Sequence, residues 1–317
     1  MDRKDDWKAW LYLAPVLILM AIFTFYPIVN PVIVSFLKDY DAATGSHSGF
    51  TFFNYAYVLG FAEKNPGSGV YNHDFFSWNP ASHSAFWNTM FIAFVTVPIS
   101  ILIALLIALM IHSIGPLKKL FQTLFFLPYV TNIIAAGMVF AVIFGSDGVF
   151  NKVFGIETMW LSPASATWGS VMFVLCLYVI WNALPYKILI FLSGLEGIDQ
   201  QYYQAARIDG ASRAKAAIKV TVPLLSPQIL YITVTSFIAG LKEYSSIIGL
   251  INRSKSSTQA LGNDMYTAVY YIYDQIQSTD WSRSSQYADA AAVLLLVVIL
   301  LFTLLELWLS RKKVVYR

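Results

Sequence analysis

Charged residues are scarce in this chain of 317 residues, because Asp, Glu, Lys and Arg together make up only 12% of it. Soluble domains usually carry about 25% charged residues, whereas the apolar share of this chain is 57%. This composition excludes a soluble globular domain, and a net charge of only +3 excludes a disordered chain and a nucleic-acid-binding module. The lone cysteine, Cys176, excludes an internal disulfide. The composition therefore indicates an integral membrane protein.

Sequence motifs of catalysis are missing as well. The chain has no Gly-Lys dipeptide, and hence no P-loop, and no Gly-x-Ser-x-Gly nucleophile elbow. Its histidines follow no metal-binding spacing; they are His47, His73, His83 and His112. A Ser-x-x-Lys match at 212–215 consists of common residues in a basic loop, and we interpret it as a coincidence. We expect no catalytic residue and no metal site in this chain.

Six segments are long and apolar enough to cross a bilayer as helices, for which about 20 residues are needed. They cover residues 10–37, 87–111, 120–145, 168–192, 222–251 and 288–309. We therefore expect an all-α integral membrane protein with six transmembrane helices. No connecting loop is long enough for a separate domain, so residues 1–317 are expected to form a single transmembrane domain.

The distribution of lysine and arginine predicts an orientation. Most of these residues fall on the side that holds both termini and the loop 193–221. The loops 38–86 and 252–287 carry fewer basic and more acidic residues. Because basic loops stay in the cytoplasm, we expect both termini and the loop 193–221 to be cytoplasmic and the other two loops to be extracytoplasmic.

The cytoplasmic loop 193–221 is the most informative part of the chain. Asp199 is suited to cap a helix of about three turns that ends at Gly210. A second short helix is expected over 211–219, and Pro223 marks the entry into the next span. Taken alone, this pattern indicates only a solvated helical hairpin between two spans.

The spacing within this loop resembles the EAA loop of the permeases of binding-protein-dependent ABC importers. The matching residues are Gln204-Ala205-Ala206, Gly210 and Val220-Thr221-Val222-Pro223. Gln204 stands where the family usually has glutamate, and valines replace Ile and Leu. The stretch 206–212, which includes Asp209, is similar to the sugar-permease branch of the family, and Leu127-Pro128-Tyr129 is a second match.

This resemblance implies an ABC type I importer permease fold for a maltose-permease-like subunit, which would lie in the bacterial inner membrane. The loop would form a coupling helix against a separate ATPase subunit; the implied contact residues are Gln204, Ala205, Ala206, Asp209 and Gly210. The implied partners are a second permease subunit in a heterodimer, two ATPase subunits and an extracytoplasmic solute-binding protein. Within the loop 252–287, the acidic, aromatic segment 266–287 either faces that binding protein or is an ordinary solvated loop. ATP and Mg would be bound by the ATPase subunits, so no cofactor is expected in this chain.

Polar residues inside the expected spans are candidates for a cargo site. On one helix, Ser236, Gly240 and Glu243 would share a face, which suits a polyhydroxylated ligand. Alternatively, Gly240 permits helix packing and Glu243 caps a helix break. In the fourth span, three residues around a proline either line a cavity or pack around a kink; they are Trp181, Asn182 and Tyr186.

The resemblance to maltose-permease-like subunits favours the cargo site in both spans and adds Tyr129 in the third span. Aromatic faces would then stack on sugar rings while carboxylate and amide groups bind hydroxyls. The implied function is to form, with the second permease, the path for an oligosaccharide. Its identity is open, and an acidic saccharide is compatible with Lys187 and Lys242. The alternatives are another small solute, such as glycerol phosphate or an amino acid, and a membrane-embedded enzyme.

Overall fold

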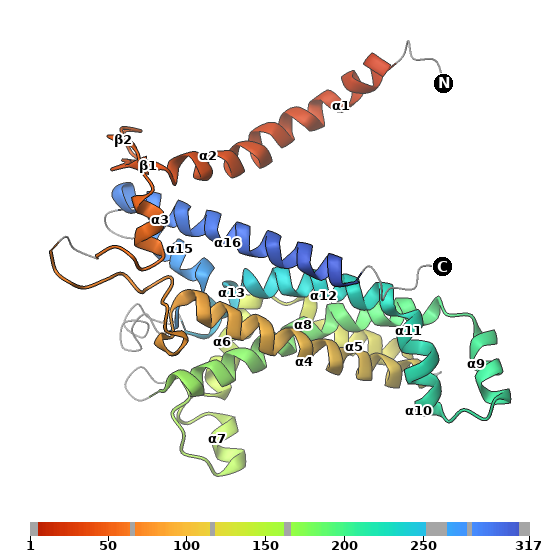
Figure 1. Ribbon diagram of the computed structural model, residues 1–317. Coiled ribbons are helices and arrows are strands. Elements are labelled where there is room, and N and C mark those ends of the chain that lie inside the picture. The colour runs from red at the N-terminus through yellow and green to blue at the C-terminus, as the bar shows by residue number, and fades with distance from the viewer. Residues whose placement is uncertain are drawn as a thin grey trace. The chain divides into compact units, whose positions relative to one another are not determined.

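The computed structural model describes residues 6–63, 67–114, 118–161, 166–251, 265–277 and 281–310, and most of these residues are helical (Figure 1). The helices of the N-terminal half are α1 (Asp6–Met20), α2 (Tyr26–Val34), α3 (Phe53–Val58), α4 (Ala85–Ser113), α5 (Lys118–Val130), α6 (Ile133–Ile143) and α7 (Val149–Phe154). Those of the C-terminal half are α8 (Trp168–Glu196), α9 (Gln200–Ile208), α10 (Arg213–Ala216), α11 (Val222–Leu224), α12 (Ser226–Leu241), α13 (Ser245–Leu250), α15 (Ala268–Gln277) and α16 (Trp281–Ser310). The strands β1 (Leu37–Lys38) and β2 (Gly49–Phe50) form one short hairpin. The expected all-α class is confirmed.

Four of the described helical segments are long and apolar enough to cross a membrane. They are Trp10–Val34, Ala85–Ser113, Trp168–Glu196 and Ser284–Ser310. Two further pairs of helices qualify if each pair is one bent span: Lys118–Val130 with Ile133–Ile143, at an angle of 96°, and Arg213–Leu224 with Ser226–Leu241, at 67°. The described residues thus hold six spans when each bent pair counts as one.

The third of the expected spans, 120–145, is divided into α5 and α6. The break has a local cause, because the Asn132 side chain accepts hydrogen bonds from the backbone N–H groups of Ile134 and Ala135, at 2.9 and 3.2 Å. An asparagine in this position starts a new helix instead of continuing the old one. Hydropathy averaged over the segment does not reveal a single capping residue, so the sequence predicts one continuous span here.

The fifth expected span, 222–251, is divided twice. A bend at the buried residue Leu225 separates α11 from α12. A second break, at 242–244, separates α12 from α13, so Glu243 lies between two helices and not within one. The expected helical face shared by Ser236, Gly240 and Glu243 is therefore corrected: the helix holds the first two residues and ends before the third.

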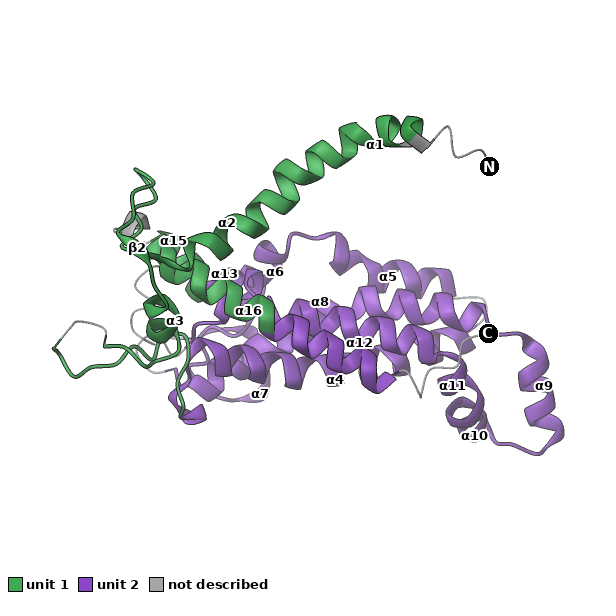
Figure 2. Cartoon of the chain, turned by 45° about the horizontal axis from the view of Figure 1, so that its top comes forward, with its two compact units in different colours: residues 1–78, 271–297 green, residues 79–270, 298–317 purple. Residues whose placement is uncertain are grey.

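The chain forms two compact units, which Figure 2 shows in two colours. Unit 1 comprises residues 1–78 and 271–297. Its buried Asn54 joins α3 to the end of α2, because the side-chain amide donates to the carbonyls of Ser35 and Leu37, at 2.9 and 2.8 Å. The apolar side chains of α1 are exposed around the helix, as at Tyr12, which is 81% exposed. A helix that is apolar on all sides is typical of a membrane span.

Unit 2 comprises residues 79–270 and 298–317, and α4 and α8 form its centre. The two helices run in the same direction, because their early residues share one buried cluster and their late residues another. The first cluster joins Ile92 to Leu175, and the second joins Ala108 to Phe191. Small residues on α4 let the helices approach closely. The helices α5, α6, α12 and α13 pack beside this pair.

Candidate functional site

A cavity of about 330 Å³ lies within unit 2, between α4, α5, α8 and α12. It collects residues from five separate helices and from the break after α12, and most of its polar groups are uncharged. Its polar and aromatic lining residues are Thr96, Ser100, Tyr129, Asn182, Tyr186, Lys187, Thr235, Ser236 and Glu243. Six of the seven residues predicted from the sequence as cargo contacts therefore meet at one cavity.

Aromatic rings form one wall of this cavity. The rings of Tyr129 on α5 and Tyr186 on α8 are stacked, with centroids 6.1 Å apart and planes at 16°. The Tyr186 hydroxyl also shares a 3.0 Å hydrogen bond with the hydroxyl of Tyr231. Helix α8 continues through Pro185 without a break, so Asn182 and Tyr186, four residues apart, lie on the same side of it.

Glu243 provides the carboxylate of the cavity. Its Oε1 accepts the backbone N–H groups of Tyr244 and Ser246, at 3.1 and 3.0 Å. Its backbone carbonyl accepts the hydroxyl of Thr267 at 2.8 Å. The two interpretations offered by the sequence are compatible, because this carboxylate caps the start of α13 and also lines the cavity. The backbone donors hold this carboxylate in place.

Gly240, like Glu243, both lines the cavity and has a structural role. It lines the cavity, and a Cβ atom at this position would come within 3.3 Å of both Cα and Cβ of Ala93. The glycine therefore allows α12 to approach α4 closely. Ser236, one helical turn earlier, lies on the same side of α12 and also lines the cavity.

Two residues singled out in the sequence lie elsewhere. Trp181 is packed in the main buried cluster, with its ring 5.1 Å from that of Phe140, and it does not line the cavity. Lys242 is exposed and does not line it either. The cavity instead includes Ser100 on α4, which was not predicted, and Lys187 on α8. For Lys187, the sequence carries one signal of a place in a cavity, which is a lysine within an otherwise apolar run.

The loop 193–221 folds largely as expected. The Asp199 side chain caps α9, accepting the N–H of Gln201 at 2.9 Å. The helix ends before Gly210, whose φ of +70° is left-handed. The N–H of Gly210 donates to the carbonyl of Arg207 at 3.0 Å, which closes the last turn. Ser212 then caps α10. The predicted helix and its ends are confirmed.

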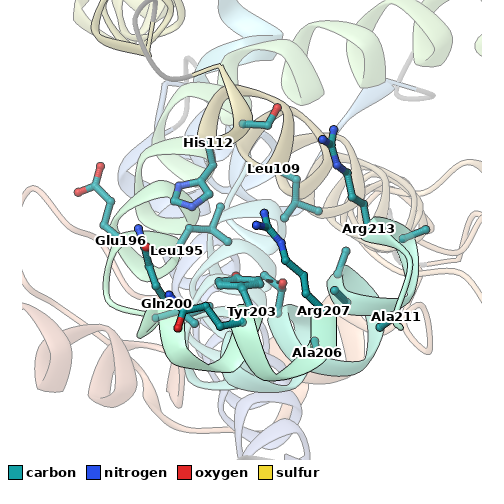
Figure 3. A pocket seen from close by; sticks show the side chains of 17 residues that line it. Leu109, His112, Leu195, Glu196, Gln200, Tyr203, Ala206, Arg207, Ala211 and Arg213 are labelled. Atoms are coloured by element: carbon teal, nitrogen blue, oxygen red, sulfur yellow. Dashed lines mark hydrogen bonds between the residues drawn. The ribbon is translucent and has the colours of Figure 1, made fainter. Parts of the chain in front are cut away.

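A second cavity, of about 800 Å³, lies between α9 and the ends of α4 and α8 (Figure 3). Tyr203, Ala206 and Arg207 of α9 line it together with Leu109 and His112 of α4. Of the five residues predicted for coupling, Gln204 and Ala206 line this cavity, whereas Ala205, Asp209 and Gly210 do not.

The opposite face of α9 is exposed and partly apolar. Tyr202, Ala205 and Ile208 follow one another at intervals of three residues, so they share a face. Ile208 is 86% exposed and adds a branched apolar side chain to this face. Sequence reasoning did not single out Ile208, although it is the one branched aliphatic residue among the polar residues of this helix.

Comparison with known proteins decides the family. The family described as binding-protein-dependent transport system inner membrane component matches residues 83–315, which include both cavities and the loop. The chain belongs to this family. It is a permease, a transport component that works with a binding protein and an ATPase, and it has the type I importer permease fold.

Curated relatives and solved structures resemble this permease over nearly its whole length. It is 27% identical to the lactose transport system permease of Rhizobium radiobacter, over 99% of this chain and 97% of that one. It is 28% identical to the arabinooligosaccharides transport system permease of Bacillus subtilis, over 95% and 88%. A chain of a bacterial ABC transporter that imports the acidic polysaccharide alginate has the same fold, with a TM-score of 0.76, 20% identity and coverage of 98% and 96%.

Proposed function

We propose that this permease forms, together with a second permease subunit, the path by which a saccharide crosses the inner membrane after delivery by an extracytoplasmic binding protein. The observation that carries the proposal is the cavity of about 330 Å³. This volume is at the lower end of the usual range for ligand sites, about 300–1,000 Å³. Similarity to permeases named for the transport of lactose and of arabino-oligosaccharides supports a saccharide as the cargo.

The chemistry of the cavity suits a sugar ring. Tyr129 and Tyr186 offer aromatic faces, against which the apolar face of a pyranose stacks. Asn182 donates and accepts hydrogen bonds, Ser236 adds a hydroxyl, and the Glu243 carboxylate accepts hydrogen bonds from sugar hydroxyls. Because the first four of these groups come from three helices, α5, α8 and α12, a shift of any one helix would change the site.

The proposed coupling uses the exposed face of α9. Ala205 leaves room on this face and Ile208 supplies an apolar contact, so the helix fits a groove on an ATPase subunit. We therefore propose that the loop 193–221 and both termini lie in the cytoplasm, which the distribution of basic residues supports. ATP and Mg would be bound by two ATPase subunits, and movement of α9 would reach the cavity through α8 and α12.

The cargo site is tested by replacing Tyr186 in the complete importer, reconstituted in proteoliposomes with its binding protein. Tyr186→Leu removes the aromatic face and is expected to lower uptake of labelled oligosaccharide by up to about tenfold, since such stacking contributes about 0.5–1.5 kcal/mol. Tyr186→Phe keeps the ring and is expected to retain uptake. Tyr231→Leu is the matched control, because this exposed tyrosine contacts Tyr186 but does not line the cavity.

Two results would contradict this assignment. Equal loss in the Leu variants of Tyr186 and Tyr231 would place the effect in helix packing. Uptake of sn-glycerol 3-phosphate or of amino acids without any uptake of saccharides would exclude the proposed cargo. The first of these solutes belongs in the panel, because a permease named for sn-glycerol-3-phosphate, from Pectobacterium atrosepticum, is also similar to this chain.

A further inference from the structure

Lys187 is a buried cation in the wall of the cavity. Only 4% of its surface is exposed, and it lies on α8 one residue after Tyr186. Its Nζ donates a hydrogen bond to the Oγ of Ser100 on α4, at 2.5 Å. The hydroxyl of Ser100 in turn donates to its own helix, where the carbonyl of Thr96 lies 2.6 Å away. The hydroxyl therefore neutralises none of the lysine's charge.

Among the described residues, only part of the hydrogen-bonding capacity of Lys187 is used. An ammonium group has three N–H donors, and one of them is satisfied by Ser100. Within the described part of the chain, no carboxylate lies at ion-pair distance from Nζ. A buried charge without a counter-charge is strongly unfavourable. A molecule that binds in the cavity would stabilise this ammonium group if it supplied hydrogen-bond acceptors and a negative charge.

The carboxylate in the cavity does not supply that charge. Glu243 directs Oε1 to two backbone N–H groups, and Gly240, three residues before it, lies against Ala93 of α4. Lys187 contacts Ser100, seven residues further along α4, which corresponds to about 10 Å along a helix at about 1.5 Å per residue. The cavity is therefore polarised, with a cation towards one end and a carboxylate towards the other.

We propose that Lys187 selects cargo saccharides that carry an anionic group, such as the carboxylate of a uronate. The anionic group accepts the N–H donors of Lys187 that Ser100 leaves unused, and the hydroxyls of the same molecule reach Asn182 and Glu243. A neutral sugar leaves the buried ammonium without a counter-charge. Repulsion by Glu243 fixes the direction in which an anionic sugar enters. This assignment rests on the proposed function.

The experiment compares two cargoes in the reconstituted importer with its binding protein: an oligosaccharide of uronates and a neutral oligosaccharide of equal length. Lys187→Met keeps the length of the side chain and removes its charge. It is expected to lower uptake of the uronate at least about tenfold, the scale of a charged hydrogen bond, and to lower uptake of the neutral oligosaccharide much less, so that the preference for the uronate falls. Lys187→Arg is expected to retain the preference. Lys242→Met is the matched control, since this lysine is exposed and outside the cavity lining.

The outcomes separate the two proposals. Equal loss of both cargoes in Lys187→Met, with normal amounts of assembled importer, would show that Lys187 only holds α8 to α4, and would overturn its role in selection. Lys187→Gln keeps a donor for Ser100 without the charge and decides the case if the Met variant does not assemble: unchanged preference for the uronate overturns the assignment. A wild-type importer that takes up the neutral sugar but not the uronate also overturns it while leaving the proposed function intact. Failure of the wild type to import any saccharide overturns both.

Discussion

Gly210 ends the helix that is proposed to couple this permease to its ATPase, and its backbone conformation makes a graded prediction possible. Its φ of +70° lies in the left-handed region, and a Cβ atom there would meet nothing within 4 Å. A side chain at this position therefore faces no steric obstacle from neighbours, and the penalty comes from the backbone alone. For a residue other than glycine it amounts to about 1–2 kcal/mol.

The expected loss of affinity for the ATPase differs among substitutions at Gly210. Gly210→Ala makes the observed loop conformation about 5- to 30-fold less populated, so the affinity for the ATPase should fall by a similar factor. Gly210→Asn should have a smaller effect, because asparagine tolerates this region. Gly210→Pro should abolish coupling, because proline holds φ near about −65° and also removes the N–H that donates to Arg207.

The assay is recovery of the ATPase with a tagged permease, coexpressed with its partner subunits, together with transport in proteoliposomes. Gly197→Ala is the matched control in the same loop, because Gly197 has a φ of −77° and its nearest Cβ contact would be at 3.5 Å. It should bind and transport normally. The reasoning is refuted if Gly210→Pro transports like the wild type, or if the Ala variants at 210 and 197 are equally impaired.

Two further predictions concern packing in unit 2. Gly137→Ala should lower the melting temperature of the purified permease, because its Cβ would lie 2.8 Å from the backbone of Gly249, and overpacking typically costs about 1–3 kcal/mol; Gly169→Ala, with open space around it, should not. Asn88→Ala should also destabilise the permease, by about 1–3 kcal/mol, because the Asn88 side chain accepts the indole N–H of Trp168 at 2.9 Å and donates to two backbone carbonyls. Unchanged thermal unfolding of either variant in detergent would contradict the corresponding contact.

Local features of this permease were predictable because they depend on neighbouring residues. The α9 helix, its Asp199 cap and its end before Gly210 follow from capping and turn preferences that act within a few residues. The breaks at Asn132 and Glu243 depend on equally local hydrogen bonds. The sequence does not predict the first break and offers the second only as an alternative, because hydropathy averaged over a span hides single capping residues.

The cavity illustrates the limit of reasoning from single helices. Trp181 and Asn182 are neighbours in the sequence and formed one predicted cluster, but consecutive residues on a helix point about 100° apart. Asn182 lines the cavity, whereas Trp181 packs against Phe140. Ser100 could not be paired with Lys187, which lies 87 residues later, before the packing of α4 against α8 was known.

By itself, the sequence determined the membrane class, the number of apolar segments, the family resemblance and the local geometry of the cytoplasmic loop, because composition, periodicity and capping act over short distances. Tertiary structure alone decided which helical faces meet. It brought Tyr129 to Tyr186, directed Trp181 into the core, and buried Lys187 with a hydrogen bond to the hydroxyl of Ser100. A transmembrane helix is apolar around most of its circumference, so its sequence gives little indication of which side will face a neighbour.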